Sequence, residues 1–450
     1  MKRKIEKELE RFLVEKEQKA LLITGARQVG KTYIIRACAR KYYQNMVEIN
    51  FLENSDARTL LQNAKSSEDI LVRLSALVGK ELIPGNTLIF FDEVQEAKEI
   101  VTAIKFLAED GRFQYLLSGS LLGVELKDIR SVPVGYLRIL EMYPLDFFEF
   151  AEALGVSQRI KDMLAHCFDS RTPVDEVVHA KMLELFHLYL IVGGMPEVVQ
   201  TYLDTKNLYR VSLVQKDILA TYRQDIGKYD VNNRLYLKEI FDLIPSELNA
   251  KNKRFIMKNL NKNFKLSRYE NSFIWLKDAG VALPCYCVGE PKLPLMLSRA
   301  TNLFKLFFSD VGLLSVMYGD GLQVKILSGD LAINYGAVYE NVVAQQLVAN
   351  GVPLYFFNSK SQGELDFVIE YRGHVLPIEV KSGKNYTRHH ALSSVLKNES
   401  YQIPEGIVFS EENVNVKGKV AYFPVYMVGF LRKDELQDSQ TYDIDLSILQ

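Results

Sequence analysis

Residues 25–32 of this chain read Gly-Ala-Arg-Gln-Val-Gly-Lys-Thr, which is the G-x-x-x-x-G-K-T spacing of a phosphate-binding loop. An apolar segment (20–23) leads into the loop, and a helical pattern (33–42) leads out of it. The glycines let successive backbone N–H groups point at a phosphate, and the helix N-terminus adds partial positive charge. We therefore expect Lys31 to reach the β- and γ-phosphates of a nucleoside triphosphate and Thr32 to hold Mg²⁺. The expected nucleotide contacts are Gly25, Ala26, Arg27, Gln28, Val29, Gly30, Lys31, Thr32 and Tyr33.

A second segment, residues 87–93, is an apolar run that ends in Asp92 and Glu93. Such a run is typical of a parallel strand buried on both faces, and ligands of these sheets bind at the carboxyl ends of the strands. Asp92 is expected to orient the magnesium, and Glu93 to take a proton from the attacking water. Ser118 follows the next strand pattern (113–117) and is a candidate contact to the γ-phosphate or the water. A plain turn explains a small residue there equally well.

Composition sets broad limits on the class of protein. The chain has 450 residues, of which 48% are hydrophobic and 25% charged, which is ordinary for a globular protein and too long for one core. Its net charge of −1 means that any nucleic-acid contact must come from a local patch. The sequence has no apolar run of membrane-spanning length, no signal-peptide core and no C-x-x-C pair among its four cysteines. We therefore expect a cytoplasmic protein with reduced thiols and no membrane partner.

The order of the expected elements divides the chain into four parts. Residues 1–150 alternate strand and helix, which predicts an α/β fold with a doubly wound parallel sheet. Residues 151–230 read as helices and would form a lid. Residues 231–325 read as short helices followed by a β-rich piece, and residues 326–450 as a helix followed by strands with a hairpin.

The C-terminal part contains a second group of chemically suggestive side chains. Asp366 lies on one expected strand of a hairpin, and Glu379 and Lys381 lie on the other. A two-residue turn at 372–373 places Asp366 opposite Glu379, with Lys381 on the same face. A bulge at Pro377 would shift this register by one residue. The hairpin therefore predicts two carboxylates and a lysine together at one end of a sheet.

Glu340 adds a third acid to this group. On an expected helix at 335–349 it lies on the apolar stripe, where a carboxylate is costly unless it is paired, hydrogen-bonded or metal-bound. Acids around Mg²⁺ with a nearby lysine suit phosphodiester hydrolysis, with Asp366 and Glu379 holding the metal and Lys381 steadying negative charge. The alternative is a charged hairpin with a snorkelling glutamate, in which case Glu340→Leu would be neutral or stabilising.

A basic stretch lies between the two groups and is free of acids from residue 251 to 268. It precedes an expected helix at 267–279 and then the β-rich piece, which is the element order of a winged-helix DNA-binding module. DNA is the expected partner of this stretch, although a run of charge also forms an ordinary solvated face. Its basic residues are Lys251, Lys253, Arg254, Lys258, Lys262, Lys265 and Arg268.

With these residues assembled, the chain resembles a family of prokaryotic AAA+ ATPases that carry a C-terminal domain of the PD-(D/E)xK nuclease type. The order of Glu340, Asp366, Glu379 and Lys381 is also similar to that of archaeal Holliday junction resolvases. The resemblance implies ATP and Mg²⁺ as ligands, a helical lid, a winged helix and a nuclease-like end. The segments that carry it are 25–32, 90–95, 117–120, 143–147, 193–196, 304–313, 363–366 and 378–381.

One departure from the family concerns assembly. Many relatives show Gly-Arg before the fifth strand, where this chain has Gly135 and Tyr136. The arginine that one subunit of a homo-oligomer would supply to its neighbour is therefore unassigned, and Arg130 and Arg138 are the candidates. Two functions follow from the sequence: Mg²⁺-dependent ATP hydrolysis coupled to DNA binding and cleavage, or an ATP-switched regulatory protein whose nuclease-like domain binds DNA or a partner without cutting.

Overall fold

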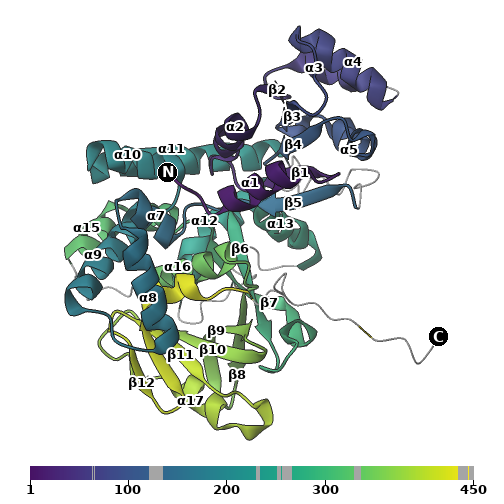
Figure 1. Cartoon of the computed structure of the whole chain (residues 1–450). Coiled ribbons are helices and arrows are strands. Elements are labelled where there is room, and N and C mark those ends of the chain that lie inside the picture. The colour runs from purple at the N-terminus through teal and green to yellow at the C-terminus, as the bar shows by residue number, and fades with distance from the viewer. Residues whose placement is uncertain are drawn as a thin grey trace.

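The N-terminal part of the chain is built on a five-stranded parallel sheet with the strand order β2-β3-β4-β1-β5 (Figure 1). The computed structural model describes residues 1–62, 64, 66–120, 135–229, 234–250, 255, 266–328, 336–433 and 444. The strands are β1 (Ala20–Thr24), β2 (Asn45–Asn50), β3 (Thr87–Asp92), β4 (Gln114–Ser118) and β5 (Leu137–Glu141). The helices of this part are α1 (Ile5–Glu15), α2 (Lys31–Tyr42), α3 (Ser55–Gln62), α4 (Ser67–Val78) and α5 (Lys98–Asp110), with a 3-10 turn η1 (Val94–Glu96). The expected parallel α/β sheet is confirmed.

Both faces of this sheet are buried, because successive side chains of a strand point to opposite sides. Leu21 and Ile23 of β1 pack with α1 and α2, whereas Ala20 and Leu22 pack with α3, α4 and α5. Strand β3, which lies between β2 and β4, is buried at every position from Thr87 to Asp92. Burial on both faces explains why these strands read as continuous apolar runs.

Helices follow the sheet. They are α7 (Phe147–Ala153), α8 (Gln158–Ser170), α9 (Glu176–Val192), α10 (Pro196–Thr205), α11 (Leu208–Tyr229), α12 (Arg234–Asn249) and α13 (Leu266–Asp278). Pro196 occupies the first turn of α10, where its missing N–H costs nothing. Among the residues that the structure describes, no single helix combines the length and hydropathy needed to span a membrane; α9 and α10 reach them only when taken together, and they are bent by 119°.

The C-terminal part is an eight-stranded mixed sheet with the order β12-β13-β11-β10-β9-β8-β6-β7 (lower half of Figure 1). Its strands are β6 (Ala282–Val288), β7 (Arg299–Phe308), β8 (Tyr355–Ser359), β9 (Gly363–Tyr371), β10 (His374–Val380), β11 (Gly406–Ser410), β12 (Asn415–Lys417) and β13 (Val420–Pro424). Its helices are α14 (Val311–Met317), α15 (Asp320–Ser328), α16 (Gly336–Ala349) and α17 (His390–Lys397), with the 3-10 turns η4 (Leu295–Ser298), η5 (Glu399–Tyr401) and η6 (Val425–Phe430).

The position of β6 and β7 differs from the sequence-based expectation. These strands correspond to the β-rich piece expected to form the wing of a separate module, but β6 pairs in parallel with β8, with Tyr286 opposite Tyr355. The boundary expected between residues 325 and 326 therefore divides strands that are hydrogen-bonded in one sheet. Pairing with a strand some 70 residues later in the chain is non-local, and no pattern within β6 or β7 indicates it.

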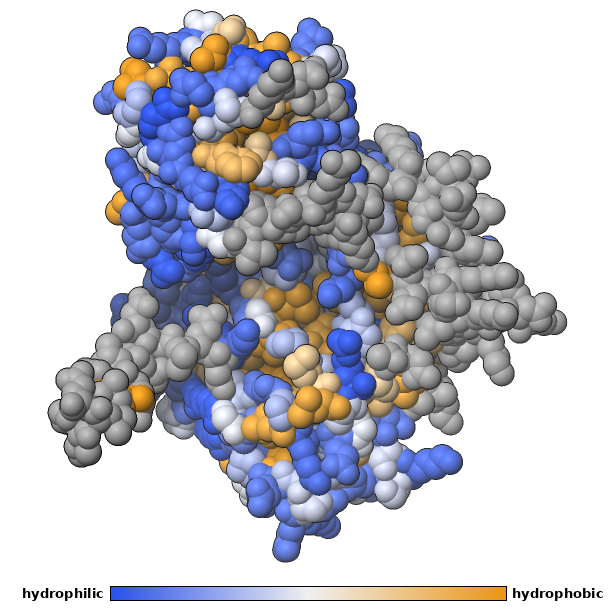
Figure 2. Space-filling view, turned by 90° about the vertical axis from the view of Figure 1, so that its right-hand side faces the viewer, coloured by the Kyte–Doolittle hydropathy of each residue, from blue (hydrophilic) through white to orange (hydrophobic). Residues whose placement is uncertain are grey.

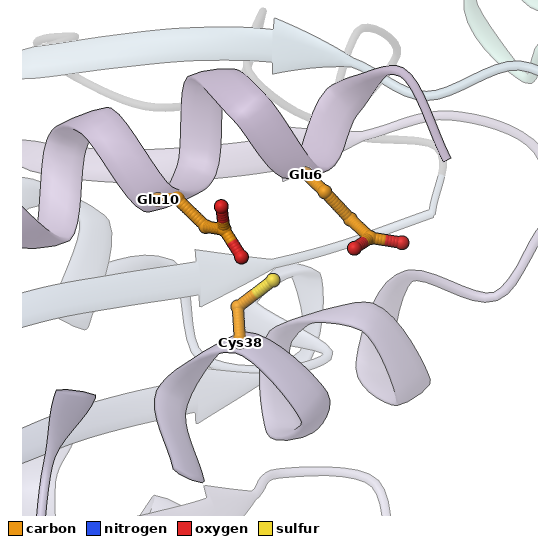
Figure 3. A group of neighbouring side chains, drawn as sticks. All are labelled: Glu6, Glu10 and Cys38. Atoms are coloured by element: carbon orange, nitrogen blue, oxygen red, sulfur yellow. The ribbon is translucent and has the colours of Figure 1, made fainter. Parts of the chain in front are cut away.

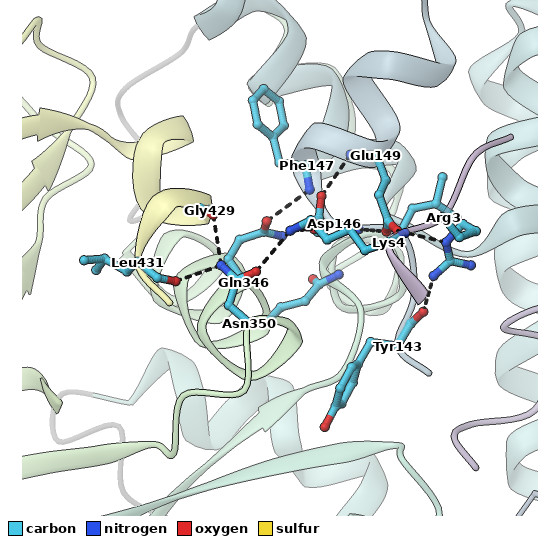
Figure 4. Close-up of polar contacts among 12 residues, drawn as sticks. Arg3, Lys4, Tyr143, Asp146, Phe147, Glu149, Gln346, Asn350, Gly429 and Leu431 are labelled. Atoms are coloured by element: carbon cyan, nitrogen blue, oxygen red, sulfur yellow. Dashed lines mark hydrogen bonds and ion pairs between the residues drawn. The ribbon is translucent and has the colours of Figure 1, made fainter. Parts of the chain in front are cut away.

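The N-terminal segment links the loop at residues 25–32 and the segment after β5 to α16 (Figure 4). The Arg3 side chain donates to the carbonyls of Val29 (3.2 Å) and Tyr143 (2.6 Å), and the Lys4 ammonium donates to the side chain of Asn350 (3.0 Å) at the end of α16. The main-chain N–H of Phe147 donates to Gln346 (3.0 Å). Buried side chains of the two sheets belong to one continuous hydrophobic core. On the surface, the molecule narrows between an upper and a lower body, and apolar residues are exposed in the hollow between them (Figure 2).

Three chain segments cross at the turn between α9 and α10. Gly194 donates its N–H to Asp310 (2.6 Å) and accepts from the N–H of Leu145 (2.7 Å). A Cβ on Gly194 would overlap the carbonyl of Leu145, and a Cβ on Gly193 would overlap the Asp310 carboxylate. Burial raises the pKa of Asp310 to about 6, and the N–H groups of Gly194 and of α14 oppose that rise. Only glycine permits backbone contact this close.

We predict that Gly194→Ala destabilises the protein by about 3 kcal/mol, because the added methyl group forces apart two hydrogen-bonded backbones. The measurement is the urea midpoint of unfolding followed by circular dichroism. Gly321→Ala is the matched control, since a Cβ at Gly321 meets no atom within 4 Å. Equal midpoints for the two variants would show that the crossing tolerates side chains.

Candidate functional site

The loop between β1 and α2 has the backbone of a phosphate cradle. Gly25 and Gly30 have φ of +134° and +94°, and Gln28 lies between them with φ of +65°. A side chain at Gly25 would overlap the carbonyl of Met142, so both the conformation and the space require glycine there. The loop ends at the first residue of α2, Lys31, so that the helix N-terminus faces the cradle.

Lys31 lies inside this loop and is almost fully buried. Its ammonium donates to the carbonyls of Gly25 (3.0 Å) and Ala26 (2.8 Å). Burial lowers the pKa of Lys31 to about 8, while the nearby Glu93 and Asp92 oppose that shift. A phosphate in the loop would supply the negative charge that this buried ammonium needs.

Asp92 lies at the end of β3, where side chains from three neighbouring elements converge on its carboxylate. Thr32 donates to both carboxylate oxygens (3.2 and 3.1 Å), and Asn50 donates to one of them (3.2 Å). Ser118 also donates to Asp92, so the structure directs its hydroxyl toward this carboxylate. Burial raises the pKa of Asp92, and the hydrogen bonds from Ser118 and Thr32 counteract the rise. Hydroxyl and carboxylate oxygens side by side are the donors that Mg²⁺ prefers.

Glu93 follows Asp92 in a left-handed conformation with φ of 55°, which turns the chain out of the sheet and into η1. Its carboxylate accepts hydrogen bonds from Gln95 and from Ser120 (3.4 Å). These two side chains hold the carboxylate at the strand end, beside the loop. The sequence analysis gave no role to Gln95, although its place two residues after the acids is a signal that could have been used.

A cavity of about 410 Å³ adjoins the loop, and it is a further feature that sequence reasoning missed. Its walls come from the N-terminal segment, the loop, the first turn of α2 and the start of α10. The wall residues include Tyr33, Ile34, Met142 and Pro196, so the lining is largely apolar. A flat, apolar heterocycle next to a phosphate site fits such a cavity.

The structure places the arginines that the sequence proposed as contacts to nucleotide or DNA, or to a neighbouring subunit, in different surroundings. Arg27 of the loop donates to Asp225 of α11 (2.6 Å) and to Ser120 (3.4 Å). Arg138 is held by Glu8 (2.6 Å) and Glu17 (3.0 Å) of its own chain. Arg130 lies outside the described residues, as do the basic residues of the 251–265 stretch; of Arg268 only the backbone, in α13, is described.

The C-terminal hairpin has the register expected from its turn. Tyr371 pairs with His374, and the pairing continues without a shift through Pro377 to Ile378. The next residues along the strands are Asp366 and Glu379, and the Asp366 carboxylate accepts a hydrogen bond from the N–H of Val380 (2.8 Å). Lys381 lies 2.7 Å from Glu379 through its ammonium. The structure thus brings Asp366, Glu379 and Lys381 together.

Glu340 joins this group from α16 through a residue that the sequence analysis missed. Lys305 of β7 is fully buried, 3.6 Å from Glu340 and 2.9 Å from Glu364. Burial disfavours its charged form, but Glu340, Glu364 and Asp366 outweigh burial and raise the pKa of Lys305. A lysine inside the apolar run 304–308 was the available signal.

The remaining acids of the cluster are Asp366 and Glu379, and the negative charge of each disfavours that of the other. Burial and the nearby Asp366 raise the pKa of Glu379 to about 8, against the opposing effect of Lys381. The pKa of Lys381 is also raised, because the attraction of Glu379 and Asp366 outweighs the effect of burial. A divalent cation between Asp366 and Glu379 would compensate this charge, so the donor set fits magnesium.

Another group of possible ligands, Glu6, Glu10 and Cys38, has its ligand atoms within 4.8 Å of one another (Figure 3). Lys41 already pairs with Glu10 (2.8 Å) and Glu6 (3.8 Å). Burial, with the added effect of Glu6, raises the pKa of the Cys38 thiol to about 11 and disfavours the thiolate that binds metals. This group is explained by the packing of α1 on α2.

Comparisons with known proteins agree with the first of these sites. Residues 17–151 match a family model described as an AAA domain. Residues 183–323 and 335–427 match two models that are each described as a domain of unknown function (DUF8612 and DUF4143). No curated protein matches the chain.

Solved structures similar to the chain include three archaeal proteins. The Walker-type ATPase PABY2304 of Pyrococcus abyssi is 15% identical, with 70% of this chain and 95% of that chain covered and a TM-score of 0.43. The ORC1 protein of Aeropyrum pernix, in complex with DNA, is 11% identical (72% and 93% covered, TM-score 0.29). Cdc6p of Pyrobaculum aerophilum is 12% identical (72% and 93% covered, TM-score 0.25). Residues 17–151, which carry the loop and the strand-end acids, are therefore similar to an AAA domain, the domain type of AAA-type ATPases.

Proposed function

We propose that the chain hydrolyses ATP with Mg²⁺ and uses its C-terminal acidic site for cleavage of DNA. The observation that carries the ATPase part is the contact of Thr32 with Asp92, next to Glu93 and to a loop that buries Lys31. The C-terminal part rests on the convergence of Asp366, Glu379 and Lys381. DNA as the substrate is supported by the basic stretch of the sequence.

In the ATPase site, each side chain has a separate task. Lys31 would exchange the carbonyls of its own loop for the oxygens of the β- and γ-phosphates. Thr32 and Asp92 would hold magnesium, which when bound neutralises the charge that develops on the phosphates. Glu93, held by Gln95 and Ser120, would accept the proton of the attacking water.

In the C-terminal site, Asp366 and Glu379 would hold magnesium, which when bound lowers the pKa of a water molecule and makes it a nucleophile. Lys381 carries a positive charge at the edge of this pair and would steady the phosphate as it gains negative charge. Glu340 pairs with Lys305, and Lys305 also attracts Asp366. Glu340 would therefore act on the site through the charge and position of this lysine.

A second function is favoured by the same buried lysine. Lys305 is a permanent internal cation that neutralises part of the acidic cluster, through Glu340 and Glu364. A domain of this kind would be stable without metal and could bind DNA or a protein partner without cutting it. The nucleotide would then act as a conformational switch. Cleavage assays separate this alternative from the main proposal.

We predict that Glu93→Gln binds ATP like the parent but lowers the rate of hydrolysis by about 10² to 10⁴, because it removes the proton acceptor and keeps the shape. Lys31→Ala should abolish binding. Phosphate release and ATP affinity are the measurements. Glu96→Gln is the matched control: Glu96 lies on the same turn and pairs with Arg58 (3.2 Å). Undiminished turnover by Glu93→Gln would contradict the assignment of the base.

We predict structure-selective, metal-dependent cleavage of DNA that Asp366→Ala abolishes. Linear, forked and four-way DNA would be incubated with Mg²⁺ or Mn²⁺, with and without ATP. Glu405→Ala is a control acid, since Glu405 belongs to the same domain and pairs with Arg171. Cutting that persists in Asp366→Ala would belong to another site. Bound but uncut DNA would favour the regulatory function, and equal cutting with and without ATP would exclude coupling.

The Lys305 contacts reverse the sequence-based expectation for Glu340→Leu. We predict that this variant destabilises the protein by about 3 kcal/mol, because it leaves the buried Lys305 short of a counter-charge. Lys305→Met should cost a similar amount, and the double variant should recover most of the loss, since it removes both charges. Urea unfolding of the four proteins measures this coupling. Strictly additive losses would show that the pair is not coupled.

A further inference from the structure

Arg27 occupies an unusual place for a residue of the phosphate-binding loop. It lies two residues after Gly25, and its guanidinium reaches to helix α11, where Nη1 is 2.6 Å from the Asp225 carboxylate. The Asp225 side chain is 7% exposed and that of Arg27 is 25% exposed. Tyr222, one turn earlier on α11, donates its hydroxyl to the Arg27 carbonyl (3.1 Å). Helix α11 is therefore attached to the loop at both the backbone and the side chain of Arg27.

The other side of the Arg27 guanidinium faces the strand-end acids. Nε lies 3.4 Å from the hydroxyl of Ser120, which in turn lies 3.4 Å from the Glu93 carboxylate. Arg27 is also near enough to Lys31 to influence its ammonium. The guanidinium is thus placed between a helix of the lid and the residues assigned to the γ-phosphate and to the attacking water.

The chemistry of the guanidinium fits two partners at this place. It stays charged at all relevant pH values, and its planar set of donors binds a carboxylate or a phosphate equally well. A triphosphate in the loop carries more negative charge than the single carboxylate of Asp225. Phosphate oxygens near Lys31 would therefore compete with Asp225 for Arg27.

Other arginines near the loop are already committed to partners of their own. Arg3 is held by Glu149 (3.3 Å) and by carbonyls, and Arg36 by Glu48 (2.5 Å). Arg138 is held by Glu8 and Glu17. These three arginines belong to other segments of the chain, whereas Arg27 is part of the loop itself.

We propose that Arg27 is an arginine which this ATPase supplies to its own triphosphate, and that Asp225 positions it by holding it on α11 until nucleotide binds. The proposal rests on ATP as the ligand of the loop. Exchange of Asp225 for phosphate removes the side-chain contact between α11 and the loop and leaves the contact of Tyr222 with the Arg27 carbonyl. Helix α11 in turn packs against α12 and α14. Arg27 is the residue that contacts substrate; Asp225 acts through Arg27.

The test compares Asp225→Asn with the parent in the full-length protein. Removal of the competing charge should tighten binding of the ATP analogue AMP-PNP by about three- to tenfold, because Asn keeps the size of the side chain but holds Arg27 weakly. Binding of ADP, which lacks the γ-phosphate, should change less. Arg27→Ala should weaken AMP-PNP more than ADP and lower kcat by about 10². Calorimetry and phosphate release provide these values.

Two controls separate this role from a structural one. Asp242→Asn removes the exposed pair (2.8 Å) between Arg223 of α11 and Asp242 of α12 and should leave nucleotide binding unchanged. Asp225→Asn should have no effect on affinity once Arg27 is alanine, since Asp225 acts only through that arginine. Arg27→Lys should restore part of the affinity and little of kcat.

The outcomes distinguish this proposal from the proposed function. Weaker AMP-PNP binding by Asp225→Asn would overturn it, because the pair would then belong to the nucleotide-bound state. Arg27→Ala with parental kcat and parental preference for AMP-PNP over ADP would also overturn it. Failure of the parent to bind either nucleotide would contradict ATP as the ligand itself. An effect of Asp225→Asn that persists in the Arg27→Ala background would show a role independent of Arg27.

Discussion

The crossing at Gly193 and Gly194 is the constraint on which the arrangement of the two sheets and of the helices between them depends. The segment leaving β5 at Leu145, the turn between α9 and α10, and the segment leaving β7 at Asp310 meet there. Leu145 and Gly194 are joined through their backbones, and Gly194 is joined to the Asp310 carboxylate through its N–H. The buried Asp310 carboxylate accepts from Gly194 and also from the N–H of Leu313 (3.0 Å) at the start of α14. Because the atoms approach so closely that a Cβ would overlap them, glycine is required at 193 and 194. Helices α9 and α10 therefore have a fixed position relative to both sheets.

The same segments lead into both candidate sites. Lys305 and Asp310 are five residues apart, so the strand that supplies the buried cation of the C-terminal cluster ends at the crossing. Helix α16 carries Glu340 and, further along, Gln346, which accepts from the N–H of Phe147 at the start of α7. A displacement of the lid would therefore reach the acidic cluster through two packed elements. These packed elements are a physical link between the two sites. A change at one site on binding at the other would show that the link transmits an effect.

Local patterns made part of this structure predictable. The loop, the acids at the end of β3 and the hairpin register depend on spacing within a few residues, and the structure has the expected strands and the expected pairing of Tyr371 with His374. The features that were missed are non-local. β6 pairs with β8 across some 70 residues, and Arg27 meets Asp225 across 198. Patterns within a short segment do not indicate which distant segment it will contact. A lysine within the apolar run 304–308 did, however, indicate that an acidic partner is needed, because a buried unpaired charge is unfavourable.

The two sites satisfy their buried carboxylates in different ways. Asp92 is held by the uncharged donors of Thr32, Ser118 and Asn50, which orient its oxygens. The nearby Lys31 ammonium attracts it but donates its hydrogen bonds to carbonyls of the loop. In the C-terminal cluster, Lys305 compensates Glu340 permanently, because the lysine is fully buried and its own pKa is raised. On the proposed function, magnesium would add positive charge at Asp92, whereas in the cluster it would do so only on the side of Asp366 and Glu379. On the proposed function, the N-terminal site would draw on its metal and nucleotide for charge balance, whereas Lys305 would balance part of the C-terminal cluster with or without a metal.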